Sequence, residues 1–445
     1  MVKDLDDKDI VLPRVLIVSH NAFSDTQNNG KTLSAFFNGW DTANLAQIYL
    51  TSDIPDFSVC KSFFQLNDFD IVKRLVNNKV QGRVIDEKSI SKVKIHKDQV
   101  TKSFFLKFLR NNIGPGFRFA RDLLWFFSGF KTKKLQVFIE KYNPDVVFFQ
   151  SSNGVFAFML VRWICKKYNI PLVMQTTDDY LSKRITFNIF FWIQYFRLVS
   201  IYMWAVKYAS SVIAIGDEMS AEYSARFGGN FLVAMNAIES PTLPDNDVNS
   251  SRISFLYAGN LGLNRWKVLV LISECLSEIY EETGIHGQLS LYSLESPEPR
   301  ILSALHKPPF CSFEGAASTQ ELHLIKARSD VLLHVEAFDQ NSVFVTRLSV
   351  STKIPEYLAT GRCIYAVGPE NVASIKYIAR NNLGFYTGVQ DKNAIKNTLI
   401  KIMSDENKRA EYAGNGLLVA KEKHNPSKTA CLVRSLIIEA VAQNI

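Results

Sequence analysis

The stretch LSVSTKIPEYLATGRCIYAVGPENVASIKYI, residues 348–378, joins a helix to a strand in the order that α/β proteins repeat. Ser351 and Thr352 can cap the start of a helix, and Gly361 suits its end. The run CIYAVG (363–368) is apolar throughout, as a strand is when helices cover both faces of its sheet. The segment therefore predicts one unit of a parallel α/β sheet.

Short runs of the same kind recur along the chain and fall into two sets. The first set is VLIVSH (15–20), LAQIYL (45–50), DVVFFQ (145–150), PLVMQT (171–176) and SVIAIG (211–216). The second set is ISFLYAG (253–259), QLSLYS (288–293), DVLLHVE (330–336) and CIYAVG (363–368). Helical patterns separate the runs, which is typical of parallel strands joined by crossover helices. We therefore predict an α/β protein with two Rossmann-like, doubly wound parallel-sheet domains that face a central cleft.

A polar stretch separates the two sets of strands. The segment ESPTLPDNDVNSSR (239–252) is rich in Pro, Asp, Asn and Ser and is the best linker signal in the chain. We expect an N-terminal domain at 1–240, a linker at 241–252 and a C-terminal domain at 253–425. Residues 426–445 are expected to form a helix that can pack back on the N-terminal domain.

The composition is that of a folded protein with a modest excess of positive charge. The 445 residues are 47% hydrophobic and 21% charged, which is enough to build sizeable cores. The net charge of +8 favours anionic partners such as phosphates or an acidic membrane surface, and by itself does not argue for nucleic acid. Six scattered cysteines without a C-x-x-C pair indicate reduced thiols in a cytosolic protein and argue against a zinc site.

Signals for membrane contact are confined to two aromatic stretches. The N-terminus lacks the basic and apolar regions of a signal peptide, and the longest apolar candidate, 185–206, is interrupted by Asn188, Gln194 and Arg197. Residues 102–142 interleave Lys and Arg with Phe, Leu and Trp, which suits a surface that enters the headgroup region of an anionic bilayer. The alternative is a helical insertion whose aromatic side chains pack on the core.

The quoted segment is also a candidate phosphate site. Backbone amides at the expected helix start, with Lys353 alongside, suit a diphosphate. Glu356, one turn further, can accept two hydrogen bonds from a ribose diol. The alternative is a surface helix with an ordinary capping motif.

A second stretch, FLYAGNLGLNRWKVL (255–269), supports the phosphate interpretation. Here Gly259 and Gly262 end a strand, and Arg265 and Lys267 stand at the start of the next helix. Two such strand ends in one domain are less expected by chance than either alone. The alternative is a strand-to-helix turn with solvated basic residues.

The loop after the first strand resembles a nucleotide-binding P-loop but lacks a residue that such a loop needs. In VLIVSHNAFSDTQNNGKTLSAFF (15–37), Asp25 takes the place of the first glycine, so the backbone amides cannot form the full phosphate nest. We expect this loop to line the cleft instead, with the acceptor or donor phosphates facing His20, Asn29, Gly30 and Lys31. The alternative is a plain strand-to-helix turn.

Several segments of the sequence together resemble a known family. The segments YAGNLGLNR and STKIPEYLATGRCIYAVGP, together with NPDVVFFQSS and ASSVIAIGDEMSAEY, are similar to bacterial glycosyltransferases of the GT-B fold, close to group 1, family 4. The resemblance covers most of the chain outside residues 60–140. It implies that the C-terminal domain binds a nucleotide-sugar and that the acceptor docks on the N-terminal domain.

The resemblance also implies roles for individual residues. Glu356 would hold the ribose, and Arg265 falls where the family has a phosphate-binding Lys. The other donor-binding residues it implies are Gly259, Asn260, Gly262, Glu336, Ser351, Thr352, Lys353 and Gly368. Asn260 departs from the family's Arg, and Leu348 stands where the family has the first of two glutamates, so Glu336 is expected to approach the donor sugar instead.

Catalysis of this kind requires stabilisation of the leaving diphosphate, and Arg265 and Lys353 are the candidates. Retaining members of the family need no protein base. An inverting enzyme would need one, and Asp178 and Asp179 are the best-placed carboxylates for that role or for orienting the acceptor. The alternative for each is helix capping, and a lone His20 is more often structural.

We therefore expect a metal-independent glycosyltransferase without a cofactor, retaining in mechanism. Its donor would be a UDP-, GDP- or dTDP-sugar. Its acceptor would be a lipid-linked or oligosaccharide acceptor of O-antigen, capsule or exopolysaccharide assembly. The enzyme would be cytoplasmic, peripheral at the inner face of the cytoplasmic membrane. The alternatives are a GT-B sugar-nucleotide epimerase and a catalytically silent GT-B scaffold.

Overall fold

The computed structural model describes residues 12–24, 28–77, 82–87, 114–184, 186–238 and 252–444. The chain divides into two compact units. Unit 1 consists of Met1–Ala234 and Ser427–Ile445, and unit 2 is Met235–Pro426. The sequence placed the domain boundaries at 240 and 425. Unit 1 is thus built from both ends of the chain, and unit 2 lies between them in sequence.

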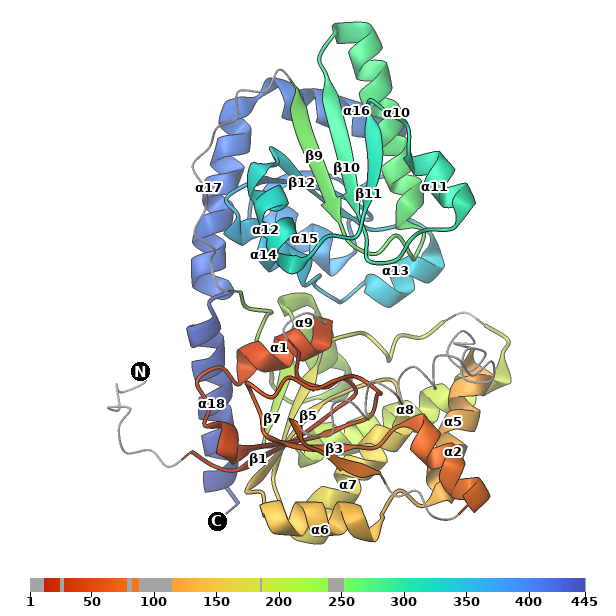
Figure 1. Cartoon of the computed structure of the whole chain (residues 1–445), viewed down its shortest axis with the longest axis vertical. Coiled ribbons are helices and arrows are strands. Elements are labelled where there is room, and N and C mark those ends of the chain that lie inside the picture. The colour runs from red at the N-terminus through yellow and green to blue at the C-terminus, as the bar shows by residue number, and fades with distance from the viewer. Residues whose placement is uncertain are drawn as a thin grey trace. The chain divides into compact units, whose positions relative to one another are not determined.

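Sheet A of unit 1, whose strands β1, β3, β5 and β7 are labelled in Figure 1, has eight strands in the order β4-β3-β2-β1-β5-β6-β7-β8. The strands are β1 (Val15–Ser19), β2 (Leu45–Tyr49), β3 (Ser62–Gln65), β4 (Arg83–Ile85), β5 (Val146–Gln150), β6 (Leu172–Thr176), β7 (Ser211–Ala214) and β8 (Phe231–Val233). Every pairing is parallel except that between β3 and β4, at the edge. The five strands expected in this half are confirmed, and β3, β4 and β8 are additional.

Helices cover sheet A and complete its core. They are α1 (Asn28–Phe36), α2 (Asp68–Asn77), α5 (Pro115–Ser128), α6 (Lys133–Tyr142), α7 (Val155–Tyr168), α8 (Ile189–Tyr208), α9 (Asp217–Phe227) and α18 (Pro426–Ala442), with a 3₁₀ turn at Thr42–Asn44. Helix α18 comes from the far end of the chain, yet its Val433 and Ile437 are fully buried in the same cluster as Val15, Phe36 and Phe148. Burial of this apolar surface ties the C-terminal segment to unit 1.

Sheet B of unit 2 has six parallel strands in the order β11-β10-β9-β12-β13-β14. The strands are β9 (Ile253–Ala258), β10 (Gly287–Tyr292), β11 (Cys311–Gly315), β12 (Val331–Val335), β13 (Cys363–Val367) and β14 (Gly384–Thr387). Four of them were expected from the sequence and are confirmed. The predicted class, α/β with two parallel-sheet domains, is therefore correct.

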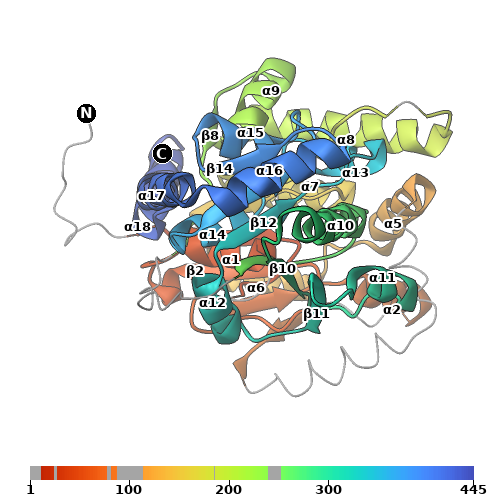
Figure 2. The same cartoon turned by 90° about the horizontal axis from the view of Figure 1, so that it is seen from above.

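Helices also surround sheet B. They are α10 (Arg265–Thr283), α11 (Pro299–Leu305), α12 (Thr319–Arg328), α13 (Gln340–Thr346), α14 (Lys353–Ala359), α15 (Ala373–Arg380), α16 (Lys392–Ser404) and α17 (Glu406–Lys423). Figure 2 shows α10 and α16 side by side, and both helices bury apolar side chains against the strands. The carboxyl ends of β9, β12 and β13 consequently lie along one edge of sheet B.

The two places where the chain passes between the units are hydrogen-bonded to each other within unit 2. The N–H of Ile238 donates to the carbonyl of His424 at 2.9 Å, and Nδ1 of His424 lies 2.7 Å from the carbonyl oxygen of Asn236. Nε2 of the same ring lies 2.9 Å from the hydroxyl of Tyr377. Burial lowers the pKa of His424 to about 4, so the ring is neutral, with its proton on Nδ1, since a carbonyl can only accept.

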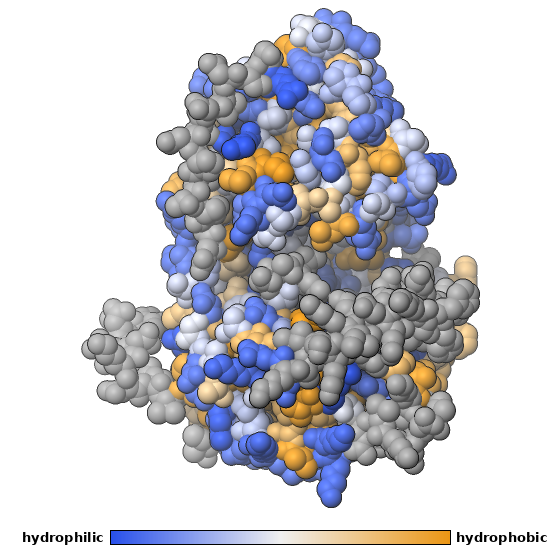
Figure 3. Space-filling model, viewed as in Figure 1, coloured by the Kyte–Doolittle hydropathy of each residue, from blue (hydrophilic) through white to orange (hydrophobic). Residues whose placement is uncertain are grey.

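The surface in the view of Figure 3 has small apolar groups interspersed with hydrophilic residues, as is usual for folded proteins. Among the described helices, α8 alone is long and apolar enough to cross a membrane by length and composition. Of the stretch 102–142, the structure describes 114–142, where Trp125 is fully buried and stacks on Phe156 with 4.2 Å between ring centroids. That side chain therefore packs on the core.

Candidate active site

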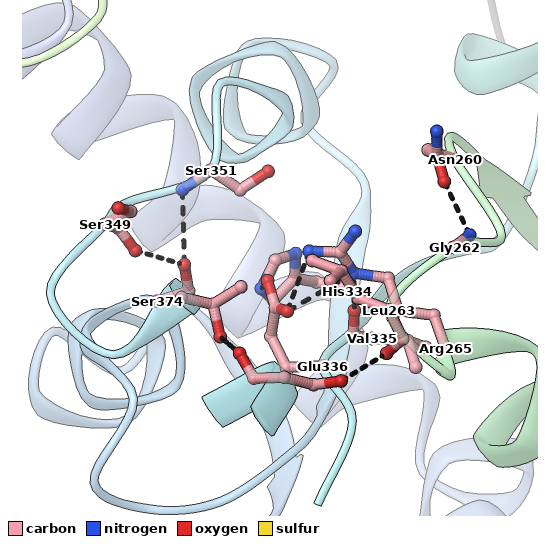
Figure 4. A network of polar contacts seen from close by, with 12 residues as sticks. Asn260, Gly262, Leu263, Arg265, His334, Val335, Glu336, Ser349, Ser351 and Ser374 are labelled. Atoms are coloured by element: carbon pink, nitrogen blue, oxygen red, sulfur yellow. Dashed lines mark hydrogen bonds and ion pairs between the residues drawn. The ribbon is translucent and has the colours of Figure 1, made fainter. Parts of the chain in front are cut away.

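The candidate site lies at the carboxyl edge of sheet B, where the loops after β9, β12 and β13 meet (Figure 4). Arg265 is the first residue of α10, and Glu336 directly follows β12. Nε and Nη2 of Arg265 lie 3.2 Å and 2.9 Å from Oε2 of Glu336. Nε also lies 3.2 Å from the carbonyl of Val335, so the guanidinium is held by both strand backbone and carboxylate.

A second cation, Lys353, reaches the same edge from α14. Its Nζ lies 3.4 Å from the hydroxyl of Tyr257 and 4.5 Å from the centre of that ring. Burial, followed by the charge of Arg265, lowers the pKa of Lys353 to about 8, against the opposing influence of Glu336 and Glu356. Two cations are thus held close together in a partly desolvated place, which an anion would stabilise.

Two glycines make room for these side chains. A Cβ added at Gly259 would lie 2.0 Å from Nζ of Lys353, and one at Gly368 would lie 2.8 Å from Cβ of Glu336. The lysine and glutamate can occupy their positions only because these residues have no side chain. The glycines were predicted to contact the ligand, and in the structure they contact the residues that would bind it.

Asn260 and Gly262 form a turn of their own. Oδ1 of Asn260 accepts a hydrogen bond from the backbone N–H of Gly262, and the asparagine side chain is exposed. This residue stands where the resembling family has Arg. In this chain its side chain shapes the loop before α10.

Glu356 is paired with a residue that the sequence reasoning missed. Nζ of Lys326, in α12, lies 2.6 Å from Oε2 of Glu356. Lys326 is only 5% exposed, which is rare for lysine without a charged partner. Nothing in the sequence around Lys326 signals this burial, because it depends on what packs over α12. Lys326 therefore holds the carboxylate that was expected to bind a ribose.

The start of α14 differs from the expected diphosphate cradle. Thr352 is the residue before the helix but makes no capping hydrogen bond. The N–H of Ser351 donates to Oγ of Ser374 at 3.2 Å, and the N–H of Lys353 donates to Oγ of Ser351 at 3.4 Å. Two of the amides that were expected to face a phosphate are therefore engaged within the fold. Because these amides are engaged, an anion at this site would be bound mainly by the side chains of Lys353 and Arg265.

His334 is a further buried residue at this edge that the sequence reasoning missed. It is 1% exposed, both ring nitrogens lack a hydrogen-bond partner among the described residues, and Nε2 lies 3.6 Å from Oε1 of Glu336. Burial, and then the charges of Lys353 and Arg265, hold its pKa well below 6.5. The ring is therefore neutral beside the ion pair of Arg265 and Glu336.

The candidate carboxylates of unit 1 lie after β6. Asp179 is 4% exposed, and its Oδ1 accepts from the hydroxyl of Tyr223 at 2.8 Å and from the N–H of Leu181 at 3.2 Å. These bonds give Asp179 a structural role, although not the expected helix capping, because residues 180–184 form no helix. Oδ2 of Asp178 accepts from the hydroxyl of Tyr180 at 2.8 Å, and Asp178 lines a small recess. The other residues that line the recess are Ser151, Ser152, Thr176, Tyr180, Leu181, Leu198, Tyr202 and Tyr223.

The loop after β1 is partly outside the described residues, and that part includes Asp25. Asn29, Gly30 and Lys31 lie inside α1, and a Cβ on Gly30 would lie 2.4 Å from the carbonyl oxygen of Ala22. The close approach expected at Gly30 is thus made by the chain's own backbone. Burial, followed by the charge of Arg121, lowers the pKa of His20 to about 4. Within the described part of the chain, no three His, Cys, Asp or Glu side chains group as a metal site would require.

The architecture is similar to that of solved structures, although comparison by sequence finds no match. No family model matches the chain, and no curated protein matches it by sequence. The structure of HepE from Anabaena with UDP aligns with 96% of this chain and 100% of its own, at a TM-score of 0.62 and 11% identity. Sucrose-phosphate synthase from Thermosynechococcus elongatus aligns with 97% of this chain and 100% of its own, at a TM-score of 0.61 and 13% identity.

The chain has the GT-B fold. TarM is another structure of similar architecture, with a TM-score of 0.60, 10% identity, and coverage of 96% of this chain and 99% of its own. TarM, HepE and sucrose-phosphate synthase are all GT-B glycosyltransferases. The expected GT-B fold is therefore confirmed. At these low identities the likeness concerns the fold, so activity has to be argued from the side chains.

Proposed function

We propose that this GT-B protein is a glycosyltransferase that binds a nucleotide-sugar donor at the carboxyl edge of sheet B. The observation that carries the proposal is the pair of cations, Arg265 and Lys353, brought together from two elements beside Gly259. Open α/β sheets bind ligands at the carboxyl ends of their strands. HepE, which has a similar fold, has been crystallised with UDP and with UDP-glucose.

A donor diphosphate would complete this arrangement electrostatically. The anion would attract both cations and raise the pKa of Lys353 back toward its usual value. Arg265 would then divide its hydrogen bonds between Glu336 and the phosphate. The same charges would stabilise the nucleoside diphosphate as it leaves, which is the part of sugar transfer where negative charge develops.

Glu356 would accept hydrogen bonds from the ribose hydroxyls while Lys326 holds its carboxylate in place. We further propose a lipid-linked or oligosaccharide acceptor on unit 1, as in O-antigen, capsule or exopolysaccharide assembly, and a retaining mechanism that needs no metal or cofactor. The resemblance in sequence supports these finer points, and the engagement of Asp179 within the fold fits a mechanism without a protein base.

Calorimetric titration of the purified chain with UDP, GDP and dTDP, and then with their sugars, tests the proposal. At least one nucleotide is expected to bind. Lys353→Met and Arg265→Met should each weaken binding about tenfold or more, because a hydrogen bond to a charged group contributes about 1.5–3 kcal/mol. Lys401→Met is the matched control, since Lys401 is exposed in the last turn of α16, is not one of the candidate site residues and should leave binding unchanged.

Three outcomes would contradict parts of the proposal. Absence of binding by every nucleotide would remove the donor site. Binding with epimerisation or hydrolysis of the donor, and no acceptor product, would favour a sugar-nucleotide epimerase. Binding without any turnover in the presence of bacterial lipid-linked saccharides would favour a catalytically silent scaffold.

A further inference from the structure

Helix α8 of unit 1 exposes an apolar stripe. Phe187, directly before the helix, is fully exposed at 104% of its reference area, and Phe196 is 61% exposed. The other large apolar side chains on this side are Ile189 at 66%, Phe190 at 47%, Ile193 at 37% and Met203 at 37%. We call these six residues the α8 face. Single exposed apolar side chains are ordinary, whereas a continuous row of this length is a sign of a partner.

Four residues of the α8 face, Ile189, Ile193, Phe196 and Met203, lie on one row of the helical repeat. Positions 189, 193, 196, 200, 203 and 207 are exposed at spacings of three and four, and only Ser200 and Lys207 among them are polar. The three polar residues that interrupt the apolar stretch 185–206 do not lie in this row. Asn188 caps the helix start, Gln194 is buried and donates to Asp122, and Arg197 lies over the ring of Phe119.

The opposite side of α8 is part of the core of unit 1, which argues against a membrane-spanning role. Leu198, Ile201, Tyr202 and Ala205 are buried. The hydroxyl of Tyr202 lies 2.9 Å from Oγ1 of Thr176 at the end of β6. A helix tied to a sheet in this way cannot leave it for a bilayer core without exposing that side. It can present its outer face to a membrane surface while staying in place.

The segment that carries α8 contains cations and no acidic residue, and the carboxylate that reaches α8 from α5, Asp122, is buried. The sequence from Tyr180 to Gly216 contains no Asp or Glu, and it contains four cations, Lys183, Arg184, Arg197 and Lys207. Lys183 and Lys207 are exposed. Apolar side chains enter the boundary between headgroups and acyl chains, and lysines beside them contact anionic headgroups. An anionic bilayer would complement both the apolar side chains and the positive charge.

We propose that the α8 face docks unit 1 on an anionic lipid bilayer. Phe187, Phe190 and Phe196 enter the headgroup region, and Lys183 and Lys207 pair with lipid phosphates. The helix lies in the plane of the interface and does not cross it. This inference is independent of the proposed sugar transfer, although a lipid-linked acceptor would be reached from such a surface.

Flotation of the full chain with vesicles tests the proposal. The protein is expected to float with phosphatidylcholine vesicles that contain phosphatidylglycerol, to float less with phosphatidylcholine alone, and to be released by salt. Phe187→Ser combined with Phe196→Ser, and Lys183→Glu combined with Lys207→Glu, should each lower the bound-to-free ratio about tenfold or more. Leu294→Ser combined with Leu418→Ser is the control, because these unit 2 residues are 86% and 62% exposed and should not matter.

Two results would overturn the proposal. One is equal flotation of the wild-type chain, both α8 variants and the control. The other is that the wild-type chain fails to float and forms a dimer without vesicles, detected by light scattering, whereas the Phe variant is a monomer. Circular dichroism of each variant shows whether it is folded. Nucleotide titration is a separate readout, so failure of the donor site would leave the flotation result interpretable.

Discussion

At the scale of single residues, Lys353 makes donor binding and stability depend on pH in opposite directions. Its pKa of about 8 in the folded protein lies below its usual value of 10.5. Because the charged form attracts a diphosphate, affinity for the nucleotide that binds should fall as pH rises through 8. Titration at pH values from 7 to about 10 measures this, and Lys353→Met should bind weakly with little change over the same range.

The stability of the ligand-free protein should instead increase as pH rises. Between pH 8 and 10.5 the unfolded chain holds a proton on Lys353 that the folded chain has released. The free energy of unfolding therefore rises with pH across this window. A loss of affinity without this gain in stability would mean that another group controls binding.

The buried pair of Lys326 and Glu356 predicts a positioning role for the lysine. Lys326→Met should weaken nucleotide binding about tenfold, because the carboxylate loses the partner that orients it. The loss should shrink for the matching 2′-deoxynucleotide if Glu356 contacts the ribose diol. Equal losses for both nucleotides would indicate a general effect on the fold, and a melting curve of the variant provides the control.

His424 predicts a loss of stability in acid. Its folded pKa of about 4 lies below the usual 6.5, so the unfolded state binds the extra proton between these values. Stability contributed by the neutral ring is present above pH 6.5 and is lost as pH falls toward 4. His424→Gln should flatten part of this slope in urea titrations. His20 has a similar pKa shift and should account for a separate part in unit 1.

At the scale of elements, α1 depends on a close backbone approach at Gly30. Gly30→Val places carbon atoms where the carbonyl oxygen of Ala22 lies, so we expect a loss of about 1–3 kcal/mol or more in the free energy of unfolding. Gly414→Ala is the control, because a Cβ there meets nothing within 4 Å in a helix, and it should stabilise by about 0.5–1 kcal/mol. Denaturant unfolding measures both.

Gly30→Val should abolish sugar transfer if α1 and its loop line the acceptor side, while nucleotide binding by unit 2 stays largely intact. Lost nucleotide binding in a folded variant would assign the loop to the donor. Normal transfer by the variant would mean that the loop is only a structural turn.

The length and burial of each strand decide whether it could be predicted from the sequence. Strands such as β1, β5 and β13 are buried on every residue, so their composition alone reveals them. Strands β4 and β8 have three residues each, too few for any period to appear. Short edge strands of this kind form because a neighbouring strand offers backbone partners, which is tertiary information.

The site could be predicted only in outline. Arg265, Lys353 and Glu356 stood out because each follows a strand or starts a helix. Lys326 and His334 were missed, because the burial of a charged or polar group is decided by what packs over it. The room that Gly259 and Gly368 leave for Lys353 and Glu336 was also missed, because the sequence does not show which side chains approach a glycine.

At the scale of the whole molecule, the division into units predicts which fragments fold. Residues 235–426 should form a soluble fragment that binds nucleotide, because sheet B, its helices and its site belong to unit 2. Residues 1–234 should not fold alone, since α18 supplies Val433, Leu436 and Ile437 to the core of unit 1. Adding residues 427–445 as a separate peptide should restore folding, measured by circular dichroism and proteolysis. A folded 1–234 fragment would show that α18 is dispensable.

The position of α18 also sets an order of events on the ribosome. Chains emerge from the amino end, and domains generally fold as units during synthesis. The strands of sheet A are made first, yet their core is incomplete until α18, which is translated after unit 2, has left the exit tunnel. Unit 2 is complete before that moment. The half of the protein that is translated first is therefore expected to mature last, and until then its apolar surface is a natural substrate for chaperones.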